Sequence, residues 1–237
     1  MRRYALIGNP LGHSFSAQYF NDKFKREGID AEYVLLPLGS IENIREIIRN
    51  ENLSGLNVTI PYKAEIIPYL DSQSPKAEAI GAVNCIKVKD DQLIGYNTDA
   101  FGFEESLRSF TEDAVKNALV LGNGGSSKAV QYVLNKLQIR FKVVSRTGSL
   151  NYENLHPAEV SACDLIVNTT PLGMYPSLDA LPMIPYEAVC SRHFVFDLIY
   201  NPEETVFLKR CRLLGAKTRN GLEMLYLQAE KSWELWN

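Results

Sequence analysis

The residue best suited to acid–base chemistry in this chain is Lys63, the last residue of the segment 57–63 (NVTIPYK). It follows the apolar run 53–58, so we expect it at a turn from a strand into a helix, where it can point into a cleft. The partial positive charge of a helix N-terminus disfavours a neighbouring ammonium. A lysine pKa drawn from about 10.4 toward neutrality makes a proton donor or acceptor. A surface lysine that opens a helix is the simpler explanation for this motif alone.

A glycine cluster, residues 122–129 (GNGGSSKA), lies between an apolar run at 118–121 and a helical stripe at 130–137. This is the context that a dinucleotide-binding fingerprint requires. Gly122 would make the tight turn, and Gly124 would let the backbone approach a pyrophosphate at the helix N-terminus. Ser127 occupies the third small position, so the pattern is imperfect, and a plain tight turn is the alternative.

The end of the next expected strand, residues 144–147 (VSRT), indicates which dinucleotide would bind. A site for NAD usually ends this strand in a carboxylate that binds the ribose 2′-hydroxyl. Here Arg146 stands instead, and a guanidinium can pair with a 2′-phosphate. The sequence therefore predicts NADPH over NADH, with an exposed loop arginine as the alternative.

The totals exclude several classes of protein. The 237 residues carry a formal net charge of −3, which argues against a nucleic-acid-binding surface. No apolar run reaches the roughly 20 residues that cross a bilayer, and the start of the chain is interpreted as a strand, not a signal peptide. The four cysteines are scattered without metal-ligand spacing, which predicts no metal site and a reducing, cytoplasmic setting.

Strands and helices alternate along the chain, which predicts an α/β fold with largely parallel sheets and crossover helices. We expect strands at 3–8, 31–36, 53–58, 82–88, 92–96, 118–121, 141–145, 163–168 and 194–198, and helices at 14–27, 41–49, 100–110 and 126–137. A hairpin turn is expected at 89–91. The pattern restarts after Asp99, so we place a domain boundary near Phe101.

Seven segments together make the chain resemble the shikimate dehydrogenase family over nearly its whole length. They are 8–16 (GNPLGHSFS), 57–63 (NVTIPYK), 81–84 (GAVN), 97–102 (NTDAFG), 168–174 (NTTPLGM), 197–202 (DLIYNP) and 221–228 (GLEMLYLQ). No segment is decisive alone, but their order and joint presence are specific. The resemblance implies two domains, an N-terminal α/β substrate-binding domain (1–100 with 220–237) and a Rossmann-like NADP-binding domain (101–219).

The resemblance also implies a reaction, the reversible reduction of 3-dehydroshikimate to shikimate with NADPH in aromatic amino-acid biosynthesis. Lys63 and Asp99 would be catalytic, because hydride transfer to a carbonyl leaves an alkoxide that needs a proton. Which of the two transfers that proton is left open. The alternative for Asp99 is an N-cap of the helix that follows it.

The substrate-binding residues implied by the resemblance are Ser14, Ser16, Thr59, Asn84, Tyr200 and Gln228. Ser14 and Ser16 lie two positions apart, so in an extended loop both hydroxyls can donate to one carboxylate. Helix capping is their alternative role. For Asn84 the alternative is a turn residue, and for Tyr200 a buried core tyrosine.

The implied cofactor-binding residues are Gly122, Asn123, Gly124, Gly125, Ser126, Ser145, Arg146, Thr147, Leu198, Gly221 and Met224. Gly221, Met224 and Gln228 fall on one face of the expected C-terminal helix. We expect this face to look into the cleft, with Met224 near the nicotinamide.

Three departures from the family pattern bear on specificity and loop structure. Ala17 stands where proline is usual, Ser145 replaces an asparagine, and residues 148–151 (GSLN) lack a second basic residue. The last departure leaves dual use of NAD and NADP open. Two alternatives also stay open, a quinate/shikimate dehydrogenase and a non-catalytic metabolite-binding relative. The expected partner is a small-molecule substrate, and the expected assembly a monomer or homodimer.

Overall fold

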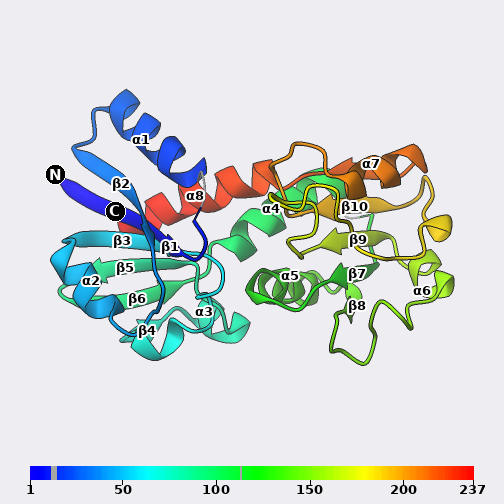
Figure 1. Ribbon diagram of the computed structural model, residues 1–237, viewed down its shortest axis with the longest axis horizontal. Helices are drawn as coiled ribbons and strands as arrows, with labels where there is room; N and C mark the ends of the chain where they lie inside the picture. Colours follow the sequence, from blue (N-terminus) through cyan, green and yellow to red (C-terminus); the bar gives the residue numbers. More distant parts are fainter. Residues whose placement is uncertain (12–14, 113) are drawn as a thin grey trace. The chain divides into compact units, whose positions relative to one another are not determined.

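The computed structural model describes residues 1–11, 15–112 and 114–237, and they form two compact units (Figure 1). The first unit comprises residues 1–98 and 229–237, and the second comprises residues 99–228. Each contains its own β-sheet, which confirms the predicted α/β class. The domain limits inferred from the sequence, at 100/101 and 219/220, stay a prediction. Among the described residues, no helix has both the length and the hydrophobicity needed to cross a membrane.

The sheet of the first unit is mixed, whereas the sequence favoured largely parallel pairing. Its strands are β1 (Arg2–Gly8), β2 (Ala31–Pro37), β3 (Leu53–Val58), β4 (Ser72–Gln73), β5 (Cys85–Lys89) and β6 (Gln92–Tyr96), in the order β2-β1-β3-β5-β6-β4. β1 pairs in parallel with β2 and β3, but β5 runs antiparallel to β3 and β6. The reversal follows from the predicted hairpin, in which Asp90 and Asp91 have φ values of 50° and 60°.

Short helices accompany this sheet. They are α1 (Phe15–Glu27), α2 (Ile44–Asn50), the 3₁₀ helix η1 (Ile67–Tyr69) and α3 (Pro75–Ile80). The sequence interpretation missed α3, although its signals are clear. Ser74 Oγ accepts from the Ala77 amide at 3.2 Å, Pro75 occupies the first turn, and Gly81 ends the helix with φ of 65°.

The end of the C-terminal helix α8 (Leu222–Trp236) belongs to the core of the first unit. A Cβ on Gly55 in β3 would lie 2.5 Å from the Trp236 ring, so only glycine leaves room for this indole. Trp236 Nε1 donates to the Ile86 carbonyl at 2.9 Å, and its ring stacks on Tyr4 with 4.7 Å between centroids. The last turn of α8 is thereby fixed to the sheet.

The sheet of the second unit is entirely parallel, as the sequence predicted. Its strands are β7 (Asn117–Leu121), β8 (Arg140–Val144), β9 (Leu165–Asn168), β10 (Phe194–Asp197) and β11 (Lys217–Arg219), in the order β11-β10-β9-β7-β8. The chain moves outward from β7 to β8 and then returns to β9 on the other side of β7. Ligands of such sheets bind outside the carboxyl ends of the strands at this switch point.

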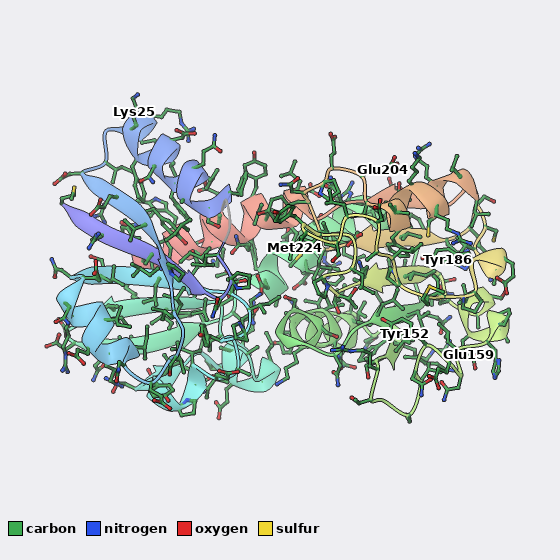
Figure 2. The ribbon with its side chains drawn as sticks, viewed as in Figure 1. Lys25, Tyr152, Glu159, Tyr186, Glu204 and Met224 are labelled. Atoms are coloured by element: carbon green, nitrogen blue, oxygen red, sulfur yellow. The ribbon has the colours of Figure 1, made fainter. Side chains whose placement is uncertain are left out.

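The helices of the second unit are α4 (Asp99–Thr111), α5 (Gly125–Lys136), α6 (Pro157–Ser161), the 3₁₀ helix η2 (Tyr186–Ala188), α7 (Val206–Leu213) and residues 222–228 of α8. α5 contacts β7 and β8, and α7 contacts β10 and β11 (Figure 1). β9 and β10 are buried along their whole length, as expected of central parallel strands. Tyr186, labelled in Figure 2, meets the Phe207 ring edge-on with 6.5 Å between centroids.

Candidate functional site

The glycine turn after β7 has the geometry that a pyrophosphate requires. Gly122 has φ of 105°, and a Cβ there would lie 2.7 Å from Thr169 Oγ1, so glycine is required on both counts. Gly124 is the N-cap of α5 without a side-chain cap, and a Cβ on it would meet no atom within 4 Å. The backbone is therefore open to close approach at the N-terminus of α5, and these residues fit a dinucleotide phosphate group.

Ser127, which made the fingerprint imperfect, has a structural role in the same turn. Its side chain is fully buried, and its hydroxyl donates to the Gly122 carbonyl at 2.8 Å. Gln131 Nε2 in turn donates to Ser127 Oγ at 3.0 Å. The serine therefore holds the glycine turn to α5 by a hydrogen bond that a third glycine could not make.

The end of β8 places Arg146 in solvent, as a 2′-phosphate site requires. Ser145 is buried, whereas Arg146 and Thr147 are exposed. The Ser145 amide donates to the Leu150 carbonyl at 3.2 Å, so the loop folds back on itself. Burial raises the pKa of Tyr152 (Figure 2), and the nearby positive charge of Arg146 opposes this rise. No carboxylate occurs between residues 145 and 151, so the cation dominates this end of the strand.

A buried polar network joins the carboxyl ends of β9 and β10, which sequence reasoning did not single out. The Asp197 carboxylate accepts from Asn168 Nδ2 at 3.0 Å, the Ile199 amide at 3.1 Å and Thr205 Oγ1 at 2.7 Å. Burial raises the pKa of Asp197 to about 6, although these hydrogen bonds act in the opposite direction. Sequence offered one signal for this network, the position of Asn168 and Asp197 at strand ends. Both residues lie at the sheet edge where α/β proteins bind ligands.

Leu198 and Gly221, both predicted cofactor residues, are brought together in the second unit. A Cβ on Gly221 would lie 2.1 Å from the Leu198 carbonyl oxygen, and the Gly221 amide donates to the Ile199 carbonyl at 3.0 Å. The close passage of these two backbones requires glycine independently of any cofactor. Tyr200, the predicted substrate residue, follows in the same segment and is half-buried.

Met224 and Gln228 lie on one face of α8, but α4 covers part of that face. A Cβ on Gly102 of α4 would lie 2.5 Å from the backbone carbonyl oxygen of Met224 and 3.1 Å from the backbone nitrogen of Gln228. Both side chains are buried, and Gln228 Nε2 donates to the Leu225 carbonyl at 3.0 Å. Gly102, part of the segment 97–102, is therefore explained by helix packing, a role that sequence reasoning missed.

The predicted surroundings of Lys63 are wrong in one respect. Residues 60–66 form successive turns after β3, and the next helical element is η1, a 3₁₀ helix of three residues that begins at Ile67. The expected α-helix therefore does not begin at Lys63. Lys63 is half-buried, and its carbonyl accepts from the Val83 amide at 2.7 Å.

Asn84 and Asn97 both use their side chains to join two chain segments. Asn84 Oδ1 accepts from the Thr98 amide at 2.6 Å, and Asn84 Nδ2 donates to Thr98 Oγ1 at 3.0 Å. Asn97 Nδ2 donates to the Ala82 carbonyl at 2.8 Å. Both asparagines are almost fully buried, so each has a structural role in joining two segments, and the substrate role of Asn84 stays a prediction.

The other predicted substrate and catalytic residues fall in different parts of the chain. Ser16 lies in the first turn of α1, and Thr59, whose amide donates to the Ile7 carbonyl at 2.9 Å, follows β3. Ser14 lies outside the described residues. Asp99 is the first residue of α4 and is buried. Lys63 belongs to the first unit and Asp99 to the second, so their meeting stays a prediction.

The histidines serve structure where they are described. His193 is fully buried. The Cys190 amide donates to its Nδ1 at 3.0 Å, so Nε2 carries the proton and donates to the Val160 carbonyl at 3.0 Å. His13 lies outside the described residues. Within the described ranges, no group of three or more histidine, cysteine or acidic side chains could hold a metal ion.

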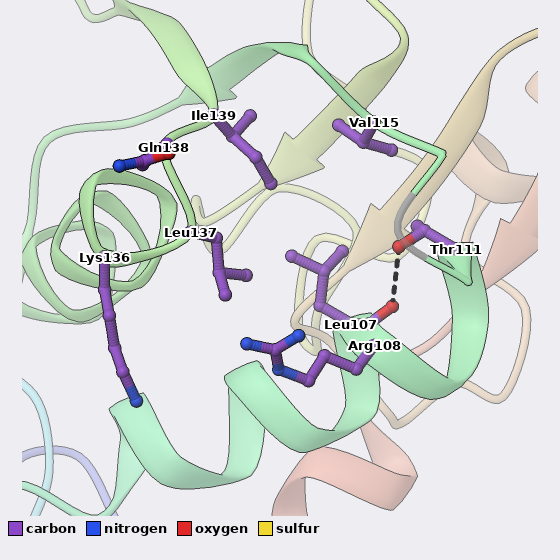
Figure 3. Close-up of a pocket in the computed structure, with 8 residues that line it drawn as sticks. All are labelled: Leu107, Arg108, Thr111, Val115, Lys136, Leu137, Gln138 and Ile139. Carbon is purple, nitrogen blue, oxygen red and sulfur yellow. Dashed lines mark hydrogen bonds between the residues drawn. The ribbon is translucent and has the colours of Figure 1, made fainter.

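A hollow between the C-terminal parts of α4 and α5 involves none of the predicted site residues (Figure 3). Its lining residues are Leu107, Arg108, Thr111, Val115, Lys136, Leu137, Gln138 and Ile139. Lys136 is held by Glu104 with both N–O distances at 2.8 Å, and Thr111 Oγ1 donates to the Leu107 carbonyl at 2.9 Å. The hollow lies near the amino-terminal edge of the second sheet, opposite the glycine turn.

Comparison with known proteins gives one consistent family. The model for the shikimate dehydrogenase substrate binding domain matches residues 6–86. The shikimate dehydrogenase (NADP(+)) of one Methanococcus maripaludis strain is 39% identical over 252 residues, which cover 98% of this chain and 90% of that protein.

Solved structures agree in fold over the whole chain. Shikimate 5-dehydrogenase from Thermus thermophilus, in complex with NADP(H) and shikimate, matches with a TM-score of 0.87 and 30% identity, covering 100% of this chain and 94% of that one. Quinate dehydrogenase from Corynebacterium glutamicum, in complex with NAD, matches with a TM-score of 0.89 and 26% identity, covering 100% and 93%.

Proposed function

Because this chain belongs to the shikimate dehydrogenase family, we propose that it catalyses the reversible, NADPH-dependent reduction of 3-dehydroshikimate to shikimate in aromatic amino-acid biosynthesis. The observation that carries this proposal is the second unit's glycine turn followed by Arg146, within a chain that matches an NADP-dependent relative over 98% of its length. A glycine turn at the switch point accepts a dinucleotide, and the arginine favours one with a 2′-phosphate.

The cofactor would be held by chain segments that the second unit places at one sheet edge. The amides at the N-terminus of α5, next to Gly124 and Gly125, suit the pyrophosphate. Arg146 and Thr147 suit the 2′-phosphate, since a guanidinium forms charge-assisted hydrogen bonds with phosphate oxygens. Asn123, Ser126, Ser145, Leu198, Gly221 and Met224 complete the proposed site. When bound, NADPH supplies the hydride.

Lys63 would provide the proton that the reaction requires. Its ammonium lies near the developing alkoxide in this proposal, stabilises the negative charge and donates a proton to that oxygen. The Asp99 carboxylate accepts a hydrogen bond from the ammonium and fixes its direction. In the reverse reaction the same groups take the proton from the shikimate hydroxyl, as microscopic reversibility demands.

The substrate carries a carboxylate and several hydroxyls, and the proposed contacts match these groups. Ser14 and Ser16 donate to the carboxylate, while Thr59, Asn84, Tyr200 and Gln228 serve the ring hydroxyls. Asn84 is held by its two hydrogen bonds with Thr98, which fix the orientation of its amide. This division leaves charge recognition to the serines and ring orientation to the other four residues.

Quinate oxidation with NAD is a second candidate function, favoured by two observations. The NAD-bound quinate dehydrogenase shares the fold over the whole chain, and residues 148–151 lack a second basic residue. A single arginine gives a weaker preference for the 2′-phosphate than two would. The proposed preference is therefore for NADPH with measurable use of NADH.

The experiment that tests the proposal follows the absorbance of reduced cofactor with 3-dehydroshikimate, and then compares shikimate with quinate in the reverse direction. We expect turnover with NADPH, and a higher kcat/KM for shikimate than for quinate. Faster turnover with NADH at equal low concentrations would contradict the cofactor assignment. Binding of shikimate without turnover would establish the non-catalytic alternative instead.

A cytoplasmic location and a monomeric or homodimeric state are further proposals, which fractionation and light scattering would test.

A further inference from the structure

We propose that Asn168 and Asp197 form a positioning pair for the dinucleotide, which holds the loop after β9 against the glycine turn. The inference rests on the proposed function and extends it to two residues that touch no reacting group. Both side chains have 0% exposure and lie at the ends of adjacent parallel strands. Buried polar groups at such a sheet edge are arranged for the ligand-binding loops that begin there.

The first step concerns the orientation of the Asn168 amide. Asn168 Oδ1 accepts from the Thr170 amide at 3.0 Å and from Thr170 Oγ1 at 2.7 Å, while Nδ2 donates to Asp197 at 3.0 Å. An ionised carboxylate only accepts hydrogen bonds, so Asp197 selects the orientation in which the amide nitrogen faces it. The amide oxygen is then directed at Thr170, where it closes the turn that starts the loop.

The second step connects this loop with the glycine turn. The amide and the hydroxyl of Thr169 both donate to the Leu121 carbonyl, at 2.9 and 2.7 Å. Thr169 Oγ1 also lies 2.7 Å from the position of a Cβ on Gly122, so it packs directly on the residue that makes the tight turn. A change in the Asn168 amide therefore displaces the wall of the proposed pyrophosphate site.

The third step concerns Leu198, which lies between two anchored residues. The Leu198 amide donates to the Asn168 carbonyl at 3.0 Å, and Asp197 Oδ1 accepts from the Ile199 amide at 3.1 Å. The Leu198 carbonyl in turn packs against Gly221. The Asn168–Asp197 pair therefore fixes both walls of the site, the loop after β9 and the segment after β10.

The other oxygen of the same carboxylate offers a matched control. Asp197 Oδ2 accepts from Thr205 Oγ1 at 2.7 Å, and Thr205 caps α7 by accepting from the Leu208 amide at 3.2 Å. Thr205→Val removes one hydrogen bond of Asp197 and the helix cap, and leaves the Asn168 side unchanged. It measures how far a loss of stability alone affects dinucleotide binding.

The test compares Asn168→Ala, Asp197→Asn and Thr205→Val with the wild type at pH 8, where Asp197 is ionised. The measurements are the NADPH Kd from nicotinamide fluorescence without substrate, the KM for 3-dehydroshikimate, and Tm.

We expect Asn168→Ala to raise the NADPH Kd about tenfold, since one buried hydrogen-bonding group is lost, with the substrate KM within about twofold of wild type. Asp197→Asn replaces an acceptor-only group by one that can also donate, so it no longer selects one orientation of the Asn168 amide and should raise the NADPH Kd in the same direction. Thr205→Val should lower Tm and leave the NADPH Kd within about twofold of wild type.

Two results would overturn the inference. One is a wild-type NADPH Kd in Asn168→Ala, or in Asp197→Asn if the alanine variant does not fold. The other is an NADPH Kd for Thr205→Val that rises as much as the Kd of Asn168→Ala and Asp197→Asn when all three variants lose the same amount of Tm. The pair would then affect binding only through stability. A wild-type protein that binds NADPH but does not reduce 3-dehydroshikimate contradicts the proposed function, and the Kd comparison still tests the pair.

Discussion

Single residues carry the chemistry of the proposal, and sequence identified them with uneven success. The resemblance supplied Lys63 and Asp99, and the structure adds that Asp99 opens α4 and that Lys63 lies in a run of turns. Sequence expected a helix to begin at Lys63, where the structure has turns, because propensity does not distinguish a tight series of turns from a short helix. The exposed position of Arg146 after β8 was predictable because an apolar strand ends directly before it, and its role at the 2′-phosphate stays a prediction.

Replacing Lys63 by alanine should lower kcat far more than it raises KM. The ammonium stabilises the alkoxide mainly in the transition state, and general acid help of this kind contributes about 10²–10⁴-fold. Steady-state kinetics with 3-dehydroshikimate measure the effect, with the exposed Lys89→Ala as control. An unchanged kcat in Lys63→Ala would remove the lysine from the chemistry.

Replacing Arg146 by glutamine should raise the Kd for NADPH about 10- to 100-fold and leave the Kd for NADH nearly unchanged. A hydrogen bond to a charged group is worth about 1.5–3 kcal/mol, and only NADPH has the 2′-phosphate that receives it. Fluorescence titrations with both cofactors give the two constants. Equal weakening of both would show that Arg146 supports the loop and not the phosphate.

Asp197 should make stability depend on pH in an unusual direction for an aspartate. Its pKa in the folded protein is raised from 3.8 to about 6, so the folded state binds the proton more tightly than the unfolded chain. The stabilisation is complete below pH 4 and is lost as pH rises through 6. Burial raises the pKa of neighbouring Cys211 to about 12 and raises that of Tyr186 as well, so both stay neutral in this window.

The check is denaturant unfolding of wild type and Asp197→Asn at pH 5 and pH 7. Wild type should gain about 1 kcal/mol relative to the variant on going from pH 7 to pH 5, by linkage for one group with these two pKa values. A difference between the two proteins that does not change with pH would show that Asp197 has an ordinary pKa.

At the scale of elements, apolar runs predicted the positions of most strands, whereas short elements without such runs were not predicted. β7, β9 and β10 were predicted within about two residues, because central parallel strands are continuously apolar. β11 is a three-residue strand (KTR) and α3 a six-residue helix, both too short for a periodic signal. The glycine turn was found because its chemistry is local, whereas the Asn168–Asp197 contact is not local and required the paired strands.

The crossing of α4 and α8 should be sensitive to one methyl group. Gly102→Ala would place a Cβ 2.5 Å from the Met224 carbonyl, and since backbone cannot yield cheaply, we expect a loss of about 1–3 kcal/mol in unfolding free energy. Denaturant unfolding measures it. Gly39→Ala is the control, because its Cβ would meet nothing within 4 Å and stability should change little. Equal effects of the two substitutions would contradict the tight crossing.

At the scale of the whole molecule, the fold and the family were predictable, because seven segments in a fixed order constrain the chain more than any one motif. The family match and the agreement in fold over the whole chain bear this out. What sequence could not give is the antiparallel pairing of β5 with β3, because the predicted hairpin fixes only how β5 and β6 pair with each other. The convergence of Lys63 and Asp99 on one substrate belongs to this scale and remains a proposal.

The most direct test of the central claim is to follow the transferred hydrogen. The protein is incubated with 3-dehydroshikimate and NADPH that carries deuterium at both C4 positions of the nicotinamide, and the product is analysed by mass spectrometry. Direct hydride transfer predicts shikimate that is heavier by one deuterium at the former carbonyl carbon. Shikimate without deuterium, or no shikimate at all, would contradict the account.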